Sequence, residues 1–65
     1  SVPNKDKFLN IVKEIKEDRN IQISDEILFK GAERFALSKG NRSPRLAKQY
    51  IDYIQARLEL NLEIE

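Results

Sequence analysis

The chain has 65 residues, of which 35% are charged; its formal net charge is +1, and it contains neither cysteine nor histidine. This limits it to one small domain and excludes disulfides, thiolate chemistry and the commonest metal ligand and general base. The balanced charge gives no strong attraction to nucleic acid or to an anionic membrane, and no apolar run approaches the roughly 20 residues of a membrane span.

Residues 4–19 have the pattern of a first helix. Phe8, Ile11, Val12 and Ile15 recur at helical spacing, and either Asn4 or Asp6 is expected to cap the start. Lysines alternate with acidic residues along this segment, which predicts a solvated face with weak ion pairs. A basic stripe that binds a partner is the alternative.

Residues 20–23 form a connector whose two isoleucines are expected to fill the space between helices. Ser24 should cap a second helix, and Gly40 should end it in a left-handed conformation. Gly31 in its middle costs about 1 kcal/mol against alanine. We expect it to allow a close helix–helix approach; the alternative is that it is simply tolerated there. The expected apolar face consists of Ile27, Leu28, Ala32, Phe35 and Ala36.

A third helix is expected to start at Ser43 and to bury Leu46, Ala47, Tyr50, Ile51, Ile54 and Leu58, with Tyr53 nearer its flank. From Leu58 to Glu65 apolar and polar residues alternate, which is a strand period. Either the helix continues to about Asn61 and frays, or a short extended tail pairs with something outside the chain.

These elements predict an all-α fold, a small three-helix bundle that forms a single domain over residues 1–65. Residues from all three helices should share one core: Phe8, Val12, Ile15, Leu28, Phe35, Leu46, Tyr50, Ile51 and Ile54.

The start of the third helix carries the candidate binding residues. Ser43 suits the N-cap and Pro44 the first helical position, so Arg45 falls in the first turn, where the helix dipole disfavours a cation by roughly 0.3–1 kcal/mol. With Arg42 just upstream, this arrangement is typical of a site that meets an anion. The alternative is a surface arginine tolerated by solvent.

The sequence contains no catalytic constellation and no metal-ligand cluster, so we expect no catalytic residue and no metal site in this chain. The second and third predicted helices, with the short loop between them, could also be a helix-turn-helix that presents Arg42, Arg45, Lys48 and Gln49 to DNA. Asp52 and Glu59 on the same helix, and the near-neutral charge, weigh against binding to nucleic acid.

The run Arg42-Ser43-Pro44-Arg45-Leu46-Ala47 resembles the second sensor motif of AAA+ ATPases, which opens a helix of their small helical lid domain. Residues 3–12, 32–37 and 40–53 together are similar to the C-terminal end of an uncharacterised bacterial family of P-loop ATPases, catalogued as a domain of unknown function. The resemblance covers nearly the whole chain except the tail after Leu58.

This resemblance implies a function that the residues alone do not. The chain would be the C-terminal lid of a larger ATPase, as its start at Ser1 rather than Met also suggests, and Arg45 would contact the phosphates of ATP. Arg42 and Ser43 are further candidate nucleotide contacts, whereas Mg and the phosphate loop would belong to another domain. The implied partner is the nucleotide-binding domain of the same chain, with assembly of the parent into a homo-oligomer as the superfamily expectation.

We expect a cytoplasmic setting, because the first residues are polar and charged and show no signal peptide. A small helical protein-interaction module, with the tail or the charged first helix as its contact, is the first alternative function, and DNA binding is the second.

Overall fold

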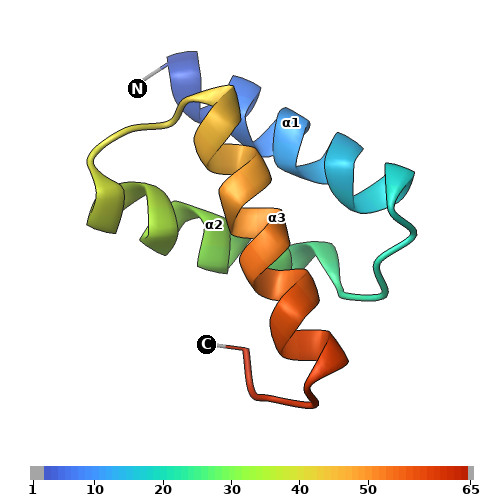
Figure 1. Ribbon diagram of the computed structural model, residues 1–65. Helices are drawn as coiled ribbons and strands as arrows, with labels where there is room; N and C mark the ends of the chain where they lie inside the picture. Colours follow the sequence, from blue (N-terminus) through green and yellow to red (C-terminus); the bar gives the residue numbers. More distant parts are fainter. Residues whose placement is uncertain (1–2, 65) are drawn as a thin grey trace.

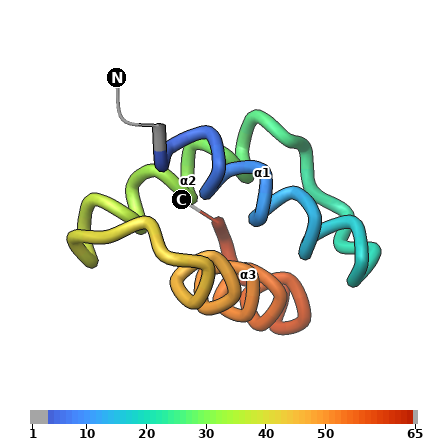
Figure 2. The backbone as a smooth tube through the Cα atoms, turned by 90° about the horizontal axis from the view of Figure 1, so that it is seen from above, coloured from blue at the N-terminus to red at the C-terminus, as the bar shows by residue number. Residues whose placement is uncertain are grey.

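The computed structural model describes residues 3–64 and contains three helices: α1 (Pro3–Asp18), α2 (Asp25–Lys39) and α3 (Pro44–Glu59). Helices α1 and α2 run in opposite directions, and α3 lies across both of them as a second layer (Figures 1 and 2). The predicted all-α three-helix bundle is therefore confirmed.

Each helix ends where one residue takes a left-handed conformation. Gly40, with φ of 76°, donates its N–H to the Ala36 carbonyl and ends α2 as predicted. Asn20 (φ 54°) and Asn61 (φ 58°) do the same after α1 and α3, since asparagine tolerates this region better than most residues. The sequence predicted the end of α1 to within a residue, at about Arg19, but not the left-handed conformation of either asparagine.

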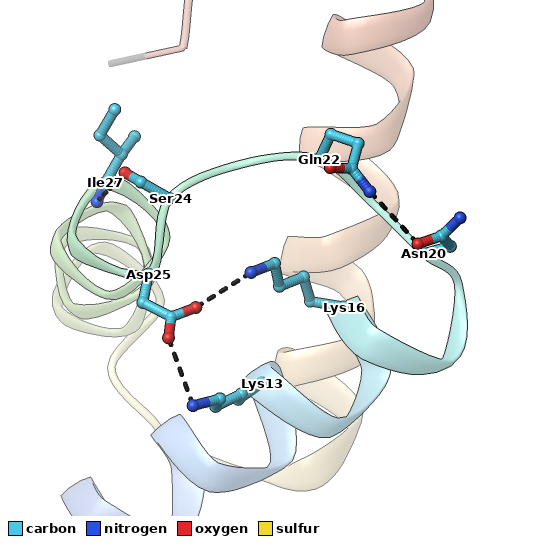
Figure 3. Close-up of polar contacts among 7 residues, drawn as sticks. All are labelled: Lys13, Lys16, Asn20, Gln22, Ser24, Asp25 and Ile27. Atoms are coloured by element: carbon cyan, nitrogen blue, oxygen red, sulfur yellow. Dashed lines mark hydrogen bonds and ion pairs between the residues drawn. The ribbon is translucent and has the colours of Figure 1, made fainter.

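The start of α2 also follows the prediction. The Ser24 hydroxyl accepts a hydrogen bond of 3.3 Å from the Ile27 N–H, and Asp25 in the first turn lies beside two lysines of α1 (Figure 3). The start of α1 differs, because the helix begins at Pro3 and Asn4 lies inside it rather than at its cap.

One core joins the three helices and the α1–α2 connector. Its buried apolar members are Phe8, Val12, Ile21, Leu28, Ala32, Ala36, Leu46, Ala47, Tyr50, Ile51 and Ile54. Ile21 is 7% exposed and Ile23 packs partly against this core, so the connector fills the bundle as predicted.

Four residues assigned to the core are less buried than predicted. Ile15 and Phe35 pack against the core only from its rim, while Ile27 is 50% exposed and Leu58 36% exposed. Ile27 lies about 100° around α2 from the buried Leu28, at the edge of the apolar face, and Leu58 lies in the last turn of α3.

Gly31 and Tyr50 show why α2 and α3 approach closely. The Tyr50 hydroxyl donates a hydrogen bond of 2.8 Å to the Leu28 carbonyl, and a Cβ on Gly31 would lie 2.4 Å from that hydroxyl oxygen. Burial raises the pKa of Tyr50 to about 12. The predicted close approach at Gly31 is thus confirmed, and the ring of Tyr50 occupies the space.

The tail after Leu58 matches neither of the two predicted alternatives fully. Helix α3 ends at Glu59 rather than at Asn61; residues 60–61 form a turn, and residues 62–64 have no regular secondary structure, so the described part of the tail contains no strand. The Leu62 N–H donates to the Arg57 carbonyl, Arg57 Nε donates to the Glu63 carbonyl, and Ile64 packs against the core. Glu65, the last residue of the alternating pattern, lies outside the described residues.

Candidate functional site

The loop between α2 and α3 is built by local side-chain contacts. Asn41 Oδ1 accepts hydrogen bonds from the Ser43 N–H at 3.1 Å and from the Ser43 hydroxyl at 2.9 Å. Such an Asx-type arrangement shapes the short turn locally. Residues 40–43 therefore leave α2 and enter α3 along a defined path.

Ser43 is the N-cap of α3, as predicted. Its backbone is extended, its hydroxyl accepts from the Leu46 N–H at 3.1 Å, and Pro44 takes the first helical position. The first turn of α3 contains no acidic residue, in contrast to the first turns of α1 and α2. The partial positive charge of this helix end is therefore not offset by a carboxylate of its own first turn.

Arg45 extends from this turn into solvent. It makes no ion pair and no side-chain hydrogen bond with any residue in the described range 3–64. Three other arginines are engaged: Arg19 with Asp52, Arg42 with Glu33, and Arg57 with the Tyr53 ring and the tail. Arg34, exposed on α2, resembles Arg45 in having no such partner within the described part.

Arg42 points back toward α2 and is only 23% exposed. Its Nε lies 3.5 Å from Glu33 Oε2, and the other oxygen of Glu33 lies 3.8 Å from Lys5 Nζ of α1. The structure thus gives the three candidate residues different surroundings: Ser43 caps the helix, Arg42 joins an ion pair, and Arg45 is exposed.

Two shallow depressions flank the α2–α3 loop, each of about 250–260 Å³. Both are lined by Asn4 and Arg42, and the second is also lined by Lys7, Ser43 and Pro44. Arg45 lines neither depression. Both are open and small, so they could take a group such as a phosphate but not enclose a whole nucleotide.

Sequence reasoning missed Glu33 as the partner of Arg42 and Lys5 as a second partner of Glu33. No local sequence pattern predicts these ion pairs, because Glu33 lies nine positions before Arg42 and Lys5 lies on another helix. Glu33 stands beside another charged residue, Arg34, so nothing in the sequence singles it out as the partner of Arg42.

Other charges hold the helices together rather than form a site. Asp25 of α2 lies 3.0 Å from Lys16 and 3.3 Å from Lys13, both of α1, and these two lysines hold the pKa of Asp25 below its usual value (Figure 3). Two of the α1 lysines therefore pair with another helix rather than within α1.

Asp52 of α3 has a similar setting. Nη1 of Arg19, in the turn after α1, lies 2.6 Å from one of its oxygens, and Lys48 Nζ lies 3.2 Å from the other. Hydrogen bonds from these cations lower the pKa of Asp52, that from Arg19 having the larger effect. Lys48, one of the residues that a helix-turn-helix would offer to DNA, is thus already paired.

Within the described residues, no group of three or more acidic side chains could hold a metal ion. Among the same residues, no helix has the length and the apolar character needed to cross a bilayer.

Comparison with known proteins identifies a family. The model of the family described as "Protein of unknown function (DUF815)" matches residues 1–58. No curated protein and no solved structure matches the chain. Because the match covers most of the 65 residues, the chain belongs to the DUF815 family.

Proposed function

We propose that this member of the DUF815 family is the nucleotide-sensing lid of an AAA+ P-loop ATPase, and that Arg45 contacts the phosphates of ATP in the full-length protein. The observation that carries the proposal is the setting of Arg45. It is an exposed guanidinium in the first turn of a helix whose start lacks a carboxylate, and it has no ion-pair partner among residues 3–64.

The described fold itself gives no reason for an arginine in the first turn of α3. A cation in the first helical turn opposes the dipole, and Arg45 gains no ion pair within residues 3–64 that offsets this cost. An anion held beside it would gain from the guanidinium and from the partial positive charge of the helix start together. The local chemistry therefore fits a phosphate group better than it serves the fold.

The residues of this chain fit only part of a nucleotide site. Arg45 would hold phosphate oxygens, Ser43 would keep the helix start in place, and the described residues offer no cluster that would hold Mg. Bound ATP supplies the phosphoryl group that is cleaved. In the proposed role the chain binds one face of it and changes its angle to the neighbouring domain when that contact is lost.

Arg42 is a weaker candidate for a phosphate contact. Its Nε faces Glu33, so an approaching phosphate would compete with an existing partner and would meet the negative charge of Glu33. We therefore expect Arg42→Ala to affect ATP turnover less than Arg45→Ala does.

The test is the steady-state ATPase rate of the full-length protein with three variants. Arg45→Ala should lower the rate about 100-fold, the size of effect seen when one preorganised donor to a developing charge is removed. Arg45→Lys should also be impaired because lysine cannot reproduce the planar fork of arginine. The control is Arg34→Ala, which removes another exposed arginine and should leave the rate unchanged.

Thermal melting of the same variants separates a functional loss from unfolding. The proposal expects all of them to melt close to the wild-type temperature, since Arg45 makes no side-chain contact that stabilises the described fold. An Arg45→Ala protein with wild-type turnover would refute the proposed role. Binding of duplex DNA at physiological salt, lost with Arg45→Ala, would instead favour the helix-turn-helix function.

A further inference from the structure

Glu33 connects three parts of the chain that are distant in sequence. One carboxylate oxygen lies 3.8 Å from Nζ of Lys5, in the first turn of α1, and the other lies 3.5 Å from Nε of Arg42, in the α2–α3 loop. Glu33 itself belongs to the middle of α2. A single carboxylate therefore links the start of α1, the body of α2 and the loop that leads to Arg45.

The contact with Arg42 is shielded from water. The side chains of Glu33 and Arg42 are 25% and 23% exposed, and the facing atoms, Glu33 Oε2 and Arg42 Nε, are themselves buried. Neither atom has a hydrogen-bond partner among the described residues, so their mutual attraction is what compensates their burial. Removing one partner leaves the other charge without that compensation, which makes the loop conformation depend on the pair.

Within the described part of the chain, no other side chain of the loop makes a contact of this reach. The Asn41 side chain bonds only to Lys39 and Ser43, and Gly40 bonds back to Ala36 at the end of α2. These contacts shape the turn but do not attach it to α1 or to the middle of α2. Arg42 supplies that attachment, one residue before the cap of α3 and three before Arg45.

We propose that Glu33 is a positioning residue, which holds Arg42 and through it fixes the direction in which the first turn of α3 presents Arg45. The inference rests on the proposed function for its consequence, because the positioned group is the proposed phosphate contact. Its structural part, the anchoring of the loop by Glu33, is independent of any nucleotide.

The first measurement tests the anchoring without nucleotide. Glu33→Gln keeps the shape of the side chain but removes its charge, so amide hydrogen exchange of residues 41–47 in the full-length protein should become faster. The control Glu14→Gln removes an exposed carboxylate in the middle of α1 that has no ion pair within residues 3–64, and it should leave exchange in this loop unchanged. Unchanged exchange in Glu33→Gln would overturn the inference.

The second measurement tests the consequence for the nucleotide. Glu33→Gln should raise the KM for ATP by about tenfold, below the roughly 100-fold loss that a displacement of about 1 Å can cause at a reacting centre. If Glu33→Gln had the same KM as Glu14→Gln while Arg45→Ala was strongly impaired, the positioning role would be overturned and the proposed function would stand. Wild-type activity of Arg45→Ala would overturn the proposed function itself, whatever the exchange data show.

A third variant covers the case in which Glu33→Gln melts early. The double variant Glu33→Gln, Arg42→Gln removes both shielded charges, so its melting temperature should return toward that of the wild type. Because the loop is still unanchored, its fast exchange and raised KM should persist. Recovery of slow exchange together with stability in the double variant would show that the pair does not position the loop.

Discussion

Replacing Gly31 with alanine tests the close approach of α2 and α3. In an exposed helix interior this change would stabilise the fold by about 1 kcal/mol. Here the new Cβ would lie 2.4 Å from the Tyr50 hydroxyl oxygen and 3.3 Å from the ring carbon that bears it. Overpacking of this kind typically costs about 1–3 kcal/mol, and a displaced hydroxyl also loses its hydrogen bond to Leu28, worth about 1 kcal/mol. We therefore expect a net destabilisation of about 1–3 kcal/mol.

The assay is urea unfolding of a double-mutant cycle. In a Tyr50→Phe background the hydroxyl is absent and the nearest side-chain atom to the new Cβ is the ring carbon, so Gly31→Ala should cost far less or even stabilise. The coupling between the two positions should be about 1–3 kcal/mol. Equal effects of Gly31→Ala in both backgrounds, or stabilisation of the wild type, would refute the reasoning.

Three further changes test the packing and the charges. Tyr50→Phe should remove a loss of stability at alkaline pH. Burial raises the folded pKa of Tyr50 from 10 to about 12, so the buried neutral phenol stabilises the fold below pH 10. Up to about 2.7 kcal/mol of the free energy of unfolding is lost as the pH rises through 12, which urea unfolding at pH 9 and 12 measures, with Tyr53→Phe as the control. Phe35→Ala should cost about 2–3 kcal/mol in urea unfolding, less than for a fully buried phenylalanine because Phe35 lies at the rim of the core, stacked on Tyr53; a cost above 4 kcal/mol would contradict this placement. Asp25→Asn should weaken the acid dependence of the melting temperature below about pH 4. Lys16 and Lys13 lower the folded pKa of Asp25, and the stability that these ion pairs contribute is lost as the pH falls through that pKa. A melting temperature with the same acid dependence as the wild type would contradict this prediction.

The helices could be predicted because their signals are local. Ser24, Gly40 and Ser43 act through backbone groups within four residues, and apolar spacing gives the phase of each helix directly. The same local reasoning placed Gly31 at a close contact, although it could not say that Tyr50 fills the space.

The predictions that were wrong concern residues whose surroundings depend on contacts between parts of the chain that are far apart in sequence. Ile27 has the spacing of a core residue, but it lies at the edge of the buried face of α2 and is 50% exposed. Spacing alone does not show how far the neighbouring helices cover that edge. The left-handed conformation of Asn20 and Asn61 was not predicted, because an asparagine alone does not mark a helix end as glycine does. At the candidate site, Ser43 and Arg45 could be found from a helix start, whereas the Glu33–Arg42 pair depends on the packing of all three helices.

The most direct test of the account compares ATP with ADP on the full-length protein. Calorimetric titration should show that Arg45→Ala weakens binding of ATP more than binding of ADP, because a sensor must distinguish the phosphate that is cleaved. Arg34→Ala should bind both nucleotides as the wild type does. If Arg45→Ala kept the wild-type affinity for ATP and the wild-type preference over ADP, Arg45 would be a surface arginine and the central claim would be wrong.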